Sequence, residues 1–229
     1  MGDAFSAIGA LAEPLRRRLY DFVAARDDGV GREEAARAVG VPTHTARFHL
    51  DKLVEAGLLS VDHRRLSGRT GPGAGRPAKV YRRSATDIAV SLPERGYELV
   101  GHVFAAAVER SLEGAPLTEA LAEEARAAGH RDGTAYDAGQ HEGEGGELER
   151  SAEVLSGRGF EPTREGDGLV LRNCPFDALA REHTALVCGV NHDYVGGVLE
   201  GLGCDHTSAR LDPGPDRCCV RVEESAAES

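Results

Sequence analysis

The sequence predicts an α+β protein made of three successive parts. Three amphipathic helical patterns followed by two strand patterns fill the first 85 residues. Small-residue helical patterns follow them, and all five cysteines lie after residue 173, among alternating strand patterns and one long helix. We therefore expect an N-terminal helical module with a β-hairpin at 1–90, a helical segment at 91–158 and a small α+β domain at 159–229.

Charge is divided unevenly along a chain of ordinary globular composition. The 229 residues are 28% charged and 41% hydrophobic. Residues 1–85 carry 15 Lys and Arg against 10 Asp and Glu, whereas residues 86–229 carry 12 against 28, for a total of −11. This asymmetry favours a basic module that faces nucleic acid and an acidic module with another role.

Two features of the sequence indicate the cellular location of the protein. It has no run of eighteen apolar residues, so no membrane span is expected. Its first residues lack the basic and then apolar pattern of a secretory signal, and we expect a cytoplasmic protein. Stable disulfides are disfavoured there, so five cysteines in one region favour bound metal or redox chemistry.

Three helices are predicted in the first 55 residues. The first carries its apolar residues on one face, and these are Leu11, Leu15, Leu19, Phe22 and Val23. The second, "REEAARAVG", ends at Gly40. The third lies in "VPTHTARFHLDKLVEAGLL", with Thr43 as its N-cap and Phe48, Leu50, Leu53 and Val54 as its core. Two helices joined by a short turn with glycine form a helix-turn-helix.

A β-hairpin with a basic, glycine-rich turn follows the third helix. Its strands are "GLLSVDHRRL" and "AKVYRRS", and "SGRTGPGAGRP" joins them. A helix-turn-helix followed by such a hairpin is a winged helix, and we expect it to bind double-stranded operator DNA through base edges and phosphates. The candidate DNA contacts are Thr43, His44, Thr45, Arg47, His49, Lys52, Arg69, Arg76 and Lys79. The alternative is that these charges only solvate exposed faces.

Residues 11–83, with the third-helix segment and "GRPAKVY", resemble the ArsR-like winged-helix transcriptional regulators. The resemblance implies a regulator that binds DNA, and it does not name the signal.

The middle of the chain reads as three helices around an acidic, glycine-rich loop. The helices are "LPERGYELVGHVFAAAVERSLE", "PLTEALAEEARAAG" and "ELERSAEVLSGRG", and the loop is "AYDAGQHEGEGGE". Operator symmetry favours a two-fold homodimer, and we expect these helices to form its interface. The alternative is that they pack only within one chain.

The last seventy residues have the pattern of two hairpins around a helix. The first hairpin is "GFEPTREGDGLVLRNC", and the helix begins at about Phe176 and ends at Gly201 or Gly203. The second hairpin joins "CDHTSARLD" to "RCCVRVE".

Four of the cysteines follow the pattern C-x13-C-x15-C-x13-C, which we expect to bring one thiolate from each successive element to a common point. Strand alternation turns Cys218 inward and Cys219 outward, unless a bulge at the doublet reverses the two. Four thiolates suit an iron–sulfur cluster or tetrahedral zinc. The candidate ligands are Cys174, Cys188, Cys204 and Cys218, with Cys219, His183 and His192 as alternates.

Other interpretations of the cysteines stay open. Each could be a small buried apolar residue, and Cys219 could form a regulatory disulfide. An enzyme is disfavoured, because "CPF" has no adjacent His–Asp pair and the chain has no glycine-rich phosphate loop.

A winged helix followed by four cysteines at intervals of about twelve to fifteen residues resembles the SufR-type regulators. These are repressors of the iron–sulfur cluster assembly operon that carry a [4Fe-4S] cluster. The resemblance covers essentially the whole chain. It implies that Cys174, Cys188 and Cys218 are ligands, with Cys204 at a less constant position, and that the loaded form represses cluster-assembly genes.

Overall fold

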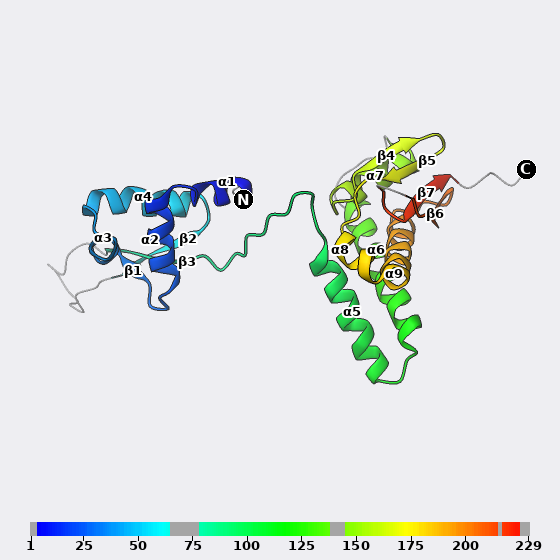
Figure 1. The fold of residues 1–229 in the computed structure, drawn as a ribbon, viewed down its shortest axis with the longest axis horizontal. Coiled ribbons are helices and arrows are strands. Elements are labelled where there is room, and N and C mark those ends of the chain that lie inside the picture. The colour runs from blue at the N-terminus through cyan, green and yellow to red at the C-terminus, as the bar shows by residue number, and fades with distance from the viewer. Residues whose placement is uncertain (1–3, 65–77, 138–144, 215–216, 225–229) are drawn as a thin grey trace, which may run out of the picture. The chain divides into compact units, whose positions relative to one another are not determined.

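The computed structural model describes residues 4–64, 78–137, 145–214 and 217–224. The chain divides into two compact units, Met1–Val90 and Ser91–Ser229. Each unit has its own hydrophobic core, and each is taken by itself below (Figure 1).

The N-terminal unit is a bundle of helices with a small antiparallel sheet. The helices are α1 (Ala4–Ala10), α2 (Pro14–Ala24), α3 (Arg32–Val39) and α4 (Thr43–Glu55). The strands are β1 (Val30–Gly31), β2 (Leu59–Arg64) and β3 (Ala78–Arg83), in the order β1-β3-β2. Helices α3 and α4 with the β2–β3 hairpin after them have the arrangement of a winged helix.

Local signals explain most boundaries of this unit. Gly40 ends α3 as predicted, in the left-handed conformation with a φ of 72°, which glycine adopts without strain. Glu13 caps α2, because its carboxylate accepts the backbone N–H groups of Leu15 and Arg16 at 3.1 and 2.7 Å. Neither α1 nor the two-residue β1 was predicted from the sequence.

Two expectations for α4 are wrong. Thr43 is the first helical residue, the capping position belongs to Pro42, and no side chain caps the helix. Phe48 is 58% exposed rather than part of the core, whereas Leu50 and Leu53 are fully buried as predicted. At about 100° per residue, Phe48 lies roughly 200° around the axis from Leu50, so the two cannot share a face.

The C-terminal unit packs its helices against a four-stranded antiparallel sheet in the order β4-β5-β7-β6. The helices are α5 (Tyr97–Leu112), α6 (Leu117–Asp137), α7 (Glu147–Ser156), α8 (Asp177–Glu182) and α9 (Thr184–Gly201). The strands are β4 (Pro162–Glu165), β5 (Gly168–Leu171), β6 (Thr207–Leu211) and β7 (Val220–Glu224). One core joins α5, α6 and α7 to this sheet and α9, so residues 91–158 and 159–229 form a single unit.

Two helices of this unit differ from the prediction. Helix α6 does not stop near Gly129 but continues to Asp137, and Gly129 and Gly133 lie against the backbone of α9. The long helix expected from Phe176 is interrupted at His183, where φ and ψ are −129° and 48°. There the Thr184 hydroxyl donates to the Ala180 carbonyl at 2.7 Å, a side-chain bond that competes with the helical pattern.

In the described part of the chain, no helix has both the length and the apolar character that crossing a membrane requires.

Candidate functional site

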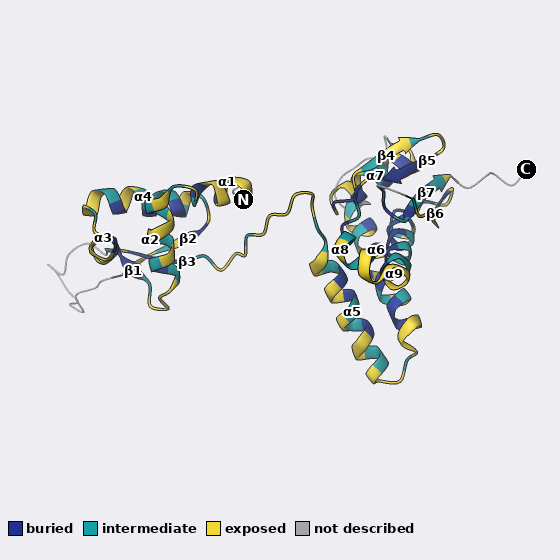
Figure 2. Cartoon of the chain, viewed as in Figure 1, coloured by how far each residue is buried: buried dark blue, intermediate teal, exposed yellow. Residues whose placement is uncertain are grey.

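The outward face of α4 carries three exposed residues of mixed chemistry. His44, Arg47 and Phe48 are exposed, whereas Ala46 and Leu50 on the opposite side are buried. Figure 2 shows exposed and buried stretches alternating along α4. Thr43 is also exposed, and Thr45 and Lys52 are partly buried. A helix with this face can offer donors and one apolar ring to a DNA groove.

Two of the predicted DNA contacts are engaged within the unit. The His49 side chain is 15% exposed, and its Nδ1 lies 3.4 Å from the Glu13 carboxylate, so it faces α2. Lys79 Nζ lies 2.8 Å from Asp51 Oδ1, and the Tyr81 hydroxyl donates to the same oxygen at 2.9 Å. Burial acts to raise the pKa of Asp51, but these two hydrogen bonds outweigh it and lower the pKa. Arg69 and Arg76 lie outside the described residues.

Four cysteines from three segments line one pocket of about 270 Å³ in the C-terminal unit. Cys174 follows β5, Cys188 lies in α9, and Cys218 and Cys219 directly precede β7. The other lining residues are Asp177, Ala180, Arg181, Thr184, Pro213, Gly214 and Arg217. The pocket therefore combines soft sulfur donors with two cationic side chains.

Backbone pairing brings the three segments together. The Cys218 N–H donates to the Leu171 carbonyl at 2.8 Å, which continues the pairing of β5 with the β7 segment. The Asp212 N–H donates to the Cys219 carbonyl at 2.8 Å and holds the cysteine pair beside the end of β6. Cys218 is buried and Cys219 is partly exposed, as strand alternation predicts, yet both line the pocket.

All five cysteines are free thiols, and the pKa values of three pocket thiols are raised. Hydrogen bonding to Cys218 and burial raise the pKa of Cys174. Burial raises the pKa of Cys188, against a hydrogen bond with Cys219 that lowers it. The pKa of Cys218 is about 11, because hydrogen bonding to Cys219 and burial together outweigh the lowering effect of Cys174. These thiols are protonated at neutral pH, so metal binding would release protons.

A buried side-chain amide, which was not predicted to have a role, donates a hydrogen bond to one of the pocket cysteines. Asn191 is fully buried in α9, three residues after Cys188, and its Nδ2 donates to Cys218 Sγ at 3.0 Å. Its Oδ1 has no hydrogen-bond partner among the described residues. A donor aimed at a cysteine sulfur is the type of contact that orients and tunes a metal ligand.

An arginine, which also was not predicted to have a role, forms hydrogen bonds between the Cys174 segment and the beginning of the C-terminal unit. Arg95 Nη1 donates to Asn173 Oδ1 at 2.8 Å and to the Cys174 carbonyl at 2.7 Å. The Gly96 N–H donates to the Pro175 carbonyl at 3.0 Å, and Asn173 Nδ2 donates to the Glu94 carbonyl at 3.1 Å. Residues 94–96 and the Cys174 segment are therefore hydrogen-bonded to each other at several points.

The other proposed ligands lie outside the pocket lining. Cys204 is 9% exposed, and its sulfur lies 3.8 Å from Ser151 Oγ and 4.0 Å from the Glu147 carbonyl oxygen. His183 is exposed at the break between α8 and α9. His192 Nε2 lies 3.2 Å from the Ala209 carbonyl, which directs its ring toward β6. The structure thus separates Cys204 from the other three cysteines and places Cys219 beside them.

The donor set of the pocket fits a soft metal centre. Cysteine sulfur is the preferred ligand of zinc, copper(I) and iron–sulfur clusters. Among the described residues, no three His, Cys, Asp or Glu side chains are arranged to hold one metal ion. The four thiols line one pocket, and interactions among them contribute to the pKa shifts of Cys174, Cys188 and Cys218.

Comparison with protein families identifies the N-terminal unit. Residues 11–62 match the model of a helix-turn-helix domain, and α2, α3 and α4 lie inside this match. The protein is a DNA-binding transcriptional regulator. No curated protein matches the chain.

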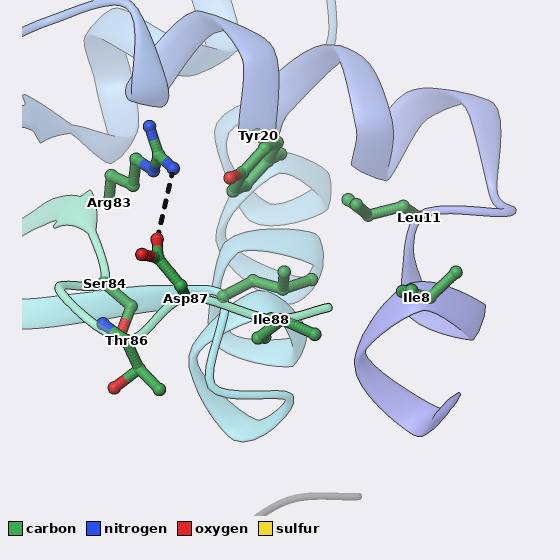
Figure 3. Close-up of a pocket in the computed structure, with 9 residues that line it drawn as sticks. Ile8, Leu11, Tyr20, Arg83, Ser84, Thr86, Asp87 and Ile88 are labelled. Carbon is green, nitrogen blue, oxygen red and sulfur yellow. Dashed lines mark hydrogen bonds and ion pairs between the residues drawn. The ribbon is translucent and has the colours of Figure 1, made fainter. Parts of the chain in front are cut away.

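The regulator has a second pocket, of about 300 Å³, in its DNA-binding unit. Figure 3 shows Ile8, Leu11, Tyr20 and Ile88 around it, with the Arg83–Asp87 ion pair on one side. Its lining includes no thiol or imidazole, so it does not resemble the cysteine pocket chemically.

Proposed function

We propose that this regulator is an operator-binding repressor that senses iron–sulfur cluster status through a [4Fe-4S] cluster. Its ligands would be Cys174, Cys188, Cys218 and Cys219. One observation carries the proposal: four cysteines from three separate segments line the same pocket. Four cysteine sulfurs form the usual ligand set of such clusters.

Cys219 replaces Cys204 in this proposal because of its position. Cys204 contacts α7 residues away from the pocket, whereas Cys219 lines the pocket beside Cys218. The doublet supplies two ligands from adjacent positions, and its backbone is fixed by hydrogen bonds to Leu171 and Asp212.

Zinc is the second candidate for this centre, because cysteine sulfur is also a common zinc ligand. A tetrahedral zinc ion needs four sulfurs at about 2.3 Å from one point. The described side chains form no such single-ion site. A cluster of several irons is a larger body than one ion, and we place it in the pocket of about 270 Å³ because of the resemblance to SufR-type regulators.

The residues around Cys174 explain how the state of the centre would reach the DNA-binding unit. When bound, the cluster would supply iron–sulfur bonds, which oxidants break and which cannot form when iron is scarce. Ligation would fix Cys174, and Arg95 and Asn173 bind the Cys174 segment to residues 94–96. The chain enters the C-terminal unit just before these residues, so a change at Cys174 is passed to the linker. Repression by the loaded form and control of cluster-assembly genes follow from the resemblance to SufR-type regulators.

We also propose that the regulator acts as a homodimer through α5. Tyr97, Val108 and Leu112 are 41, 49 and 84% exposed, and their helical spacing places them with Gly101 and Ala105 in a stripe along one side of α5. The intervals between these residues are nearly the same when counted from either end of the helix, which suits an antiparallel contact between two copies. Sedimentation analysis would give the mass that decides between monomer and dimer.

The test of the sensor is anaerobic reconstitution of the full chain with iron and sulfide, on the wild type and on single Cys→Ser variants. We expect the wild type to bind iron and sulfide in equal amounts, with a broad absorption band. We expect Cys174→Ser, Cys188→Ser and Cys218→Ser to lose the band, and Cys219→Ser to lose it or to hold the cluster far more weakly.

Cys204→Ser is the matched control, because Cys204 is also a buried thiol of this unit but lies outside the pocket. It should retain wild-type iron and sulfide content. Loss of the cluster in Cys204→Ser with retention in Cys219→Ser would return the fourth ligand to Cys204. A colourless wild type with tightly bound zinc would replace the cluster by the zinc-responsive repressor.

A further inference from the structure

The recognition helix α4 exposes a phenylalanine where a core residue was expected. Phe48 is 58% exposed, and its ring meets the edge of the His49 ring with centroids 5.2 Å apart. The buried residues Ala46, Leu50 and Leu53 lie on the other side of the helix. Phe48 is therefore at the middle of the outward face, and its ring lies outside the hydrophobic core of its own unit.

The groups around Phe48 suit contact with nucleic acid. His44 lies one turn before Phe48 on the same face, and Arg47 is exposed beside it. Asp51 lies one turn after it, and its carboxylate is held by Lys79 and Tyr81. The single acid next to the ring is thus compensated by a cation, so it does not repel a phosphate backbone.

An apolar ring on a DNA-reading face has a specific partner in the major groove. Each base pair presents hydrogen-bond donors and acceptors there, and only thymine adds an apolar group, its C5 methyl. Contact between a phenylalanine ring and this methyl buries apolar surface on both sides, and no other base offers such contact.

We infer that Phe48 is a specificity determinant that recognises the methyl group of one or two thymines in the operator. The inference rests on α4 being the DNA-reading helix of this regulator. His44 and Arg47 lie close enough on the helix to contact bases or phosphates next to that thymine.

The test uses a duplex selected from a random pool by the full-length wild-type protein. Each thymine of this duplex is then replaced singly by uracil, which removes the methyl and keeps every hydrogen-bonding group. We expect the wild type to lose about fourfold in affinity at one or two positions, the equivalent of one methyl taken from an apolar contact. Phe48→Ala should bind the thymine and uracil duplexes equally well at those positions.

Two further variants separate this role from a general loss of binding. Phe48→Leu keeps an apolar side chain and should retain part of the preference for thymine, whereas His44→Ala should weaken binding and retain the full preference. If the wild type is indifferent to every uracil, or if Phe48→Ala keeps the wild-type preference, the inference is overturned. Failure of both the reconstituted and the empty protein to select any duplex would refute DNA binding by the protein, and the inference with it.

Discussion

Asn191 is the residue whose contact with a pocket sulfur should depend on the charge of that sulfur. A neutral thiol can donate or accept a hydrogen bond, whereas a metal-bound sulfur can only accept. The Asn191 Nδ2 donates to Cys218 Sγ at 3.0 Å, and the other end of this buried amide has no partner among the described residues. The N–H···S hydrogen bond is stronger when the sulfur carries negative charge, as it would in the proposed cluster.

This contact predicts the effect of Asn191→Leu on the proposed cluster. The N–H group stabilises the additional electron of the reduced state, so its removal should lower the reduction potential. A redox titration of reconstituted wild type and variant, followed by electron paramagnetic resonance, measures the shift.

Thr207→Val is the control for Asn191→Leu. Thr207 is 8% exposed, its hydroxyl also lacks a hydrogen-bond partner among the described residues, and it does not line the pocket. The reduction potential of the cluster in Thr207→Val should equal that in the wild type. An unchanged potential in Asn191→Leu would show that the amide only fills space.

Sequence reasoning at this scale found residue types whose chemistry is evident from the side chain alone. It identified Cys174, Cys188 and Cys218, which line the pocket. It could not find Asn191 or Arg95, because an amide and a guanidinium acquire their roles from partners 27 and 78 positions away. Cys204 was preferred to Cys219 because it keeps the intervals between the cysteines regular. Regular intervals do not determine which side chains line a pocket, and Cys219 lines it whereas Cys204 does not.

The packing of α6 on α9 is the main feature at the scale of elements. Each helix carries two glycines four residues apart, at Gly129 and Gly133 in α6 and at Gly197 and Gly201 in α9. A Cβ at any of the four would collide with a backbone carbonyl of the other helix. These glycines let the two backbones touch, and α9 carries Cys188 of the pocket.

This packing predicts opposite effects for two neighbouring substitutions in α9. Gly197→Ala should lower the free energy of unfolding, because its Cβ would collide with the Arg126 carbonyl oxygen. Gly196→Ala meets nothing within 4 Å and should raise it by up to about 1 kcal/mol, because alanine favours a helix over glycine. Urea unfolding of both variants gives the comparison. Equal effects of the two substitutions would contradict the close approach of α6 and α9.

The elements that the sequence predicted well are those whose ends are set locally. Helix α3 ends at Gly40, and the β4–β5 hairpin turns between Glu165 and Gly168, as expected. The end of α6 was wrong because Gly129 was interpreted as a stop signal, whereas it lies inside the helix for close packing. Glycine is favoured both at the end of a helix and where two helices pack closely. Only the position of the neighbouring helix distinguishes the two cases.

At the scale of the whole molecule, the junction of the two units lies just before the residues that hold the Cys174 segment. The second unit begins at Ser91, and Arg95 follows four residues later. The sequence predicted a further boundary at residue 158, because helices precede it and strands follow. In the structure, side chains of α5, α6, α9 and the sheet form one hydrophobic core. The residues on both sides of position 158 therefore belong to one unit.

Arg95 is therefore the residue at which we expect the two functions to be coupled. In the wild type, removal of the cluster should weaken operator binding by a factor in the usual range of allosteric coupling, about 5 to 150. Arg95→Ala should bind iron and sulfide as the wild type does, yet its DNA affinity should hardly change when the cluster is removed. Fluorescence anisotropy on loaded and chelator-treated protein measures both affinities.

Arg181→Ala is the matched control. Arg95 and Arg181 both form an ion pair with Asp177, at 3.8 and 2.7 Å, but Arg181 lines the pocket and has no hydrogen bond to residues 94–96 in the described part of the chain. Arg181→Ala should retain the full difference between loaded and empty forms, which would assign the coupling to the Arg95 contacts and not to pocket charge. If Arg95→Ala responds to cluster loss as strongly as the wild type, the signal does not pass through the Cys174 segment. The proposed α5 dimer contact would then be the remaining route, because a change in the pairing of two copies alters the spacing of their recognition helices.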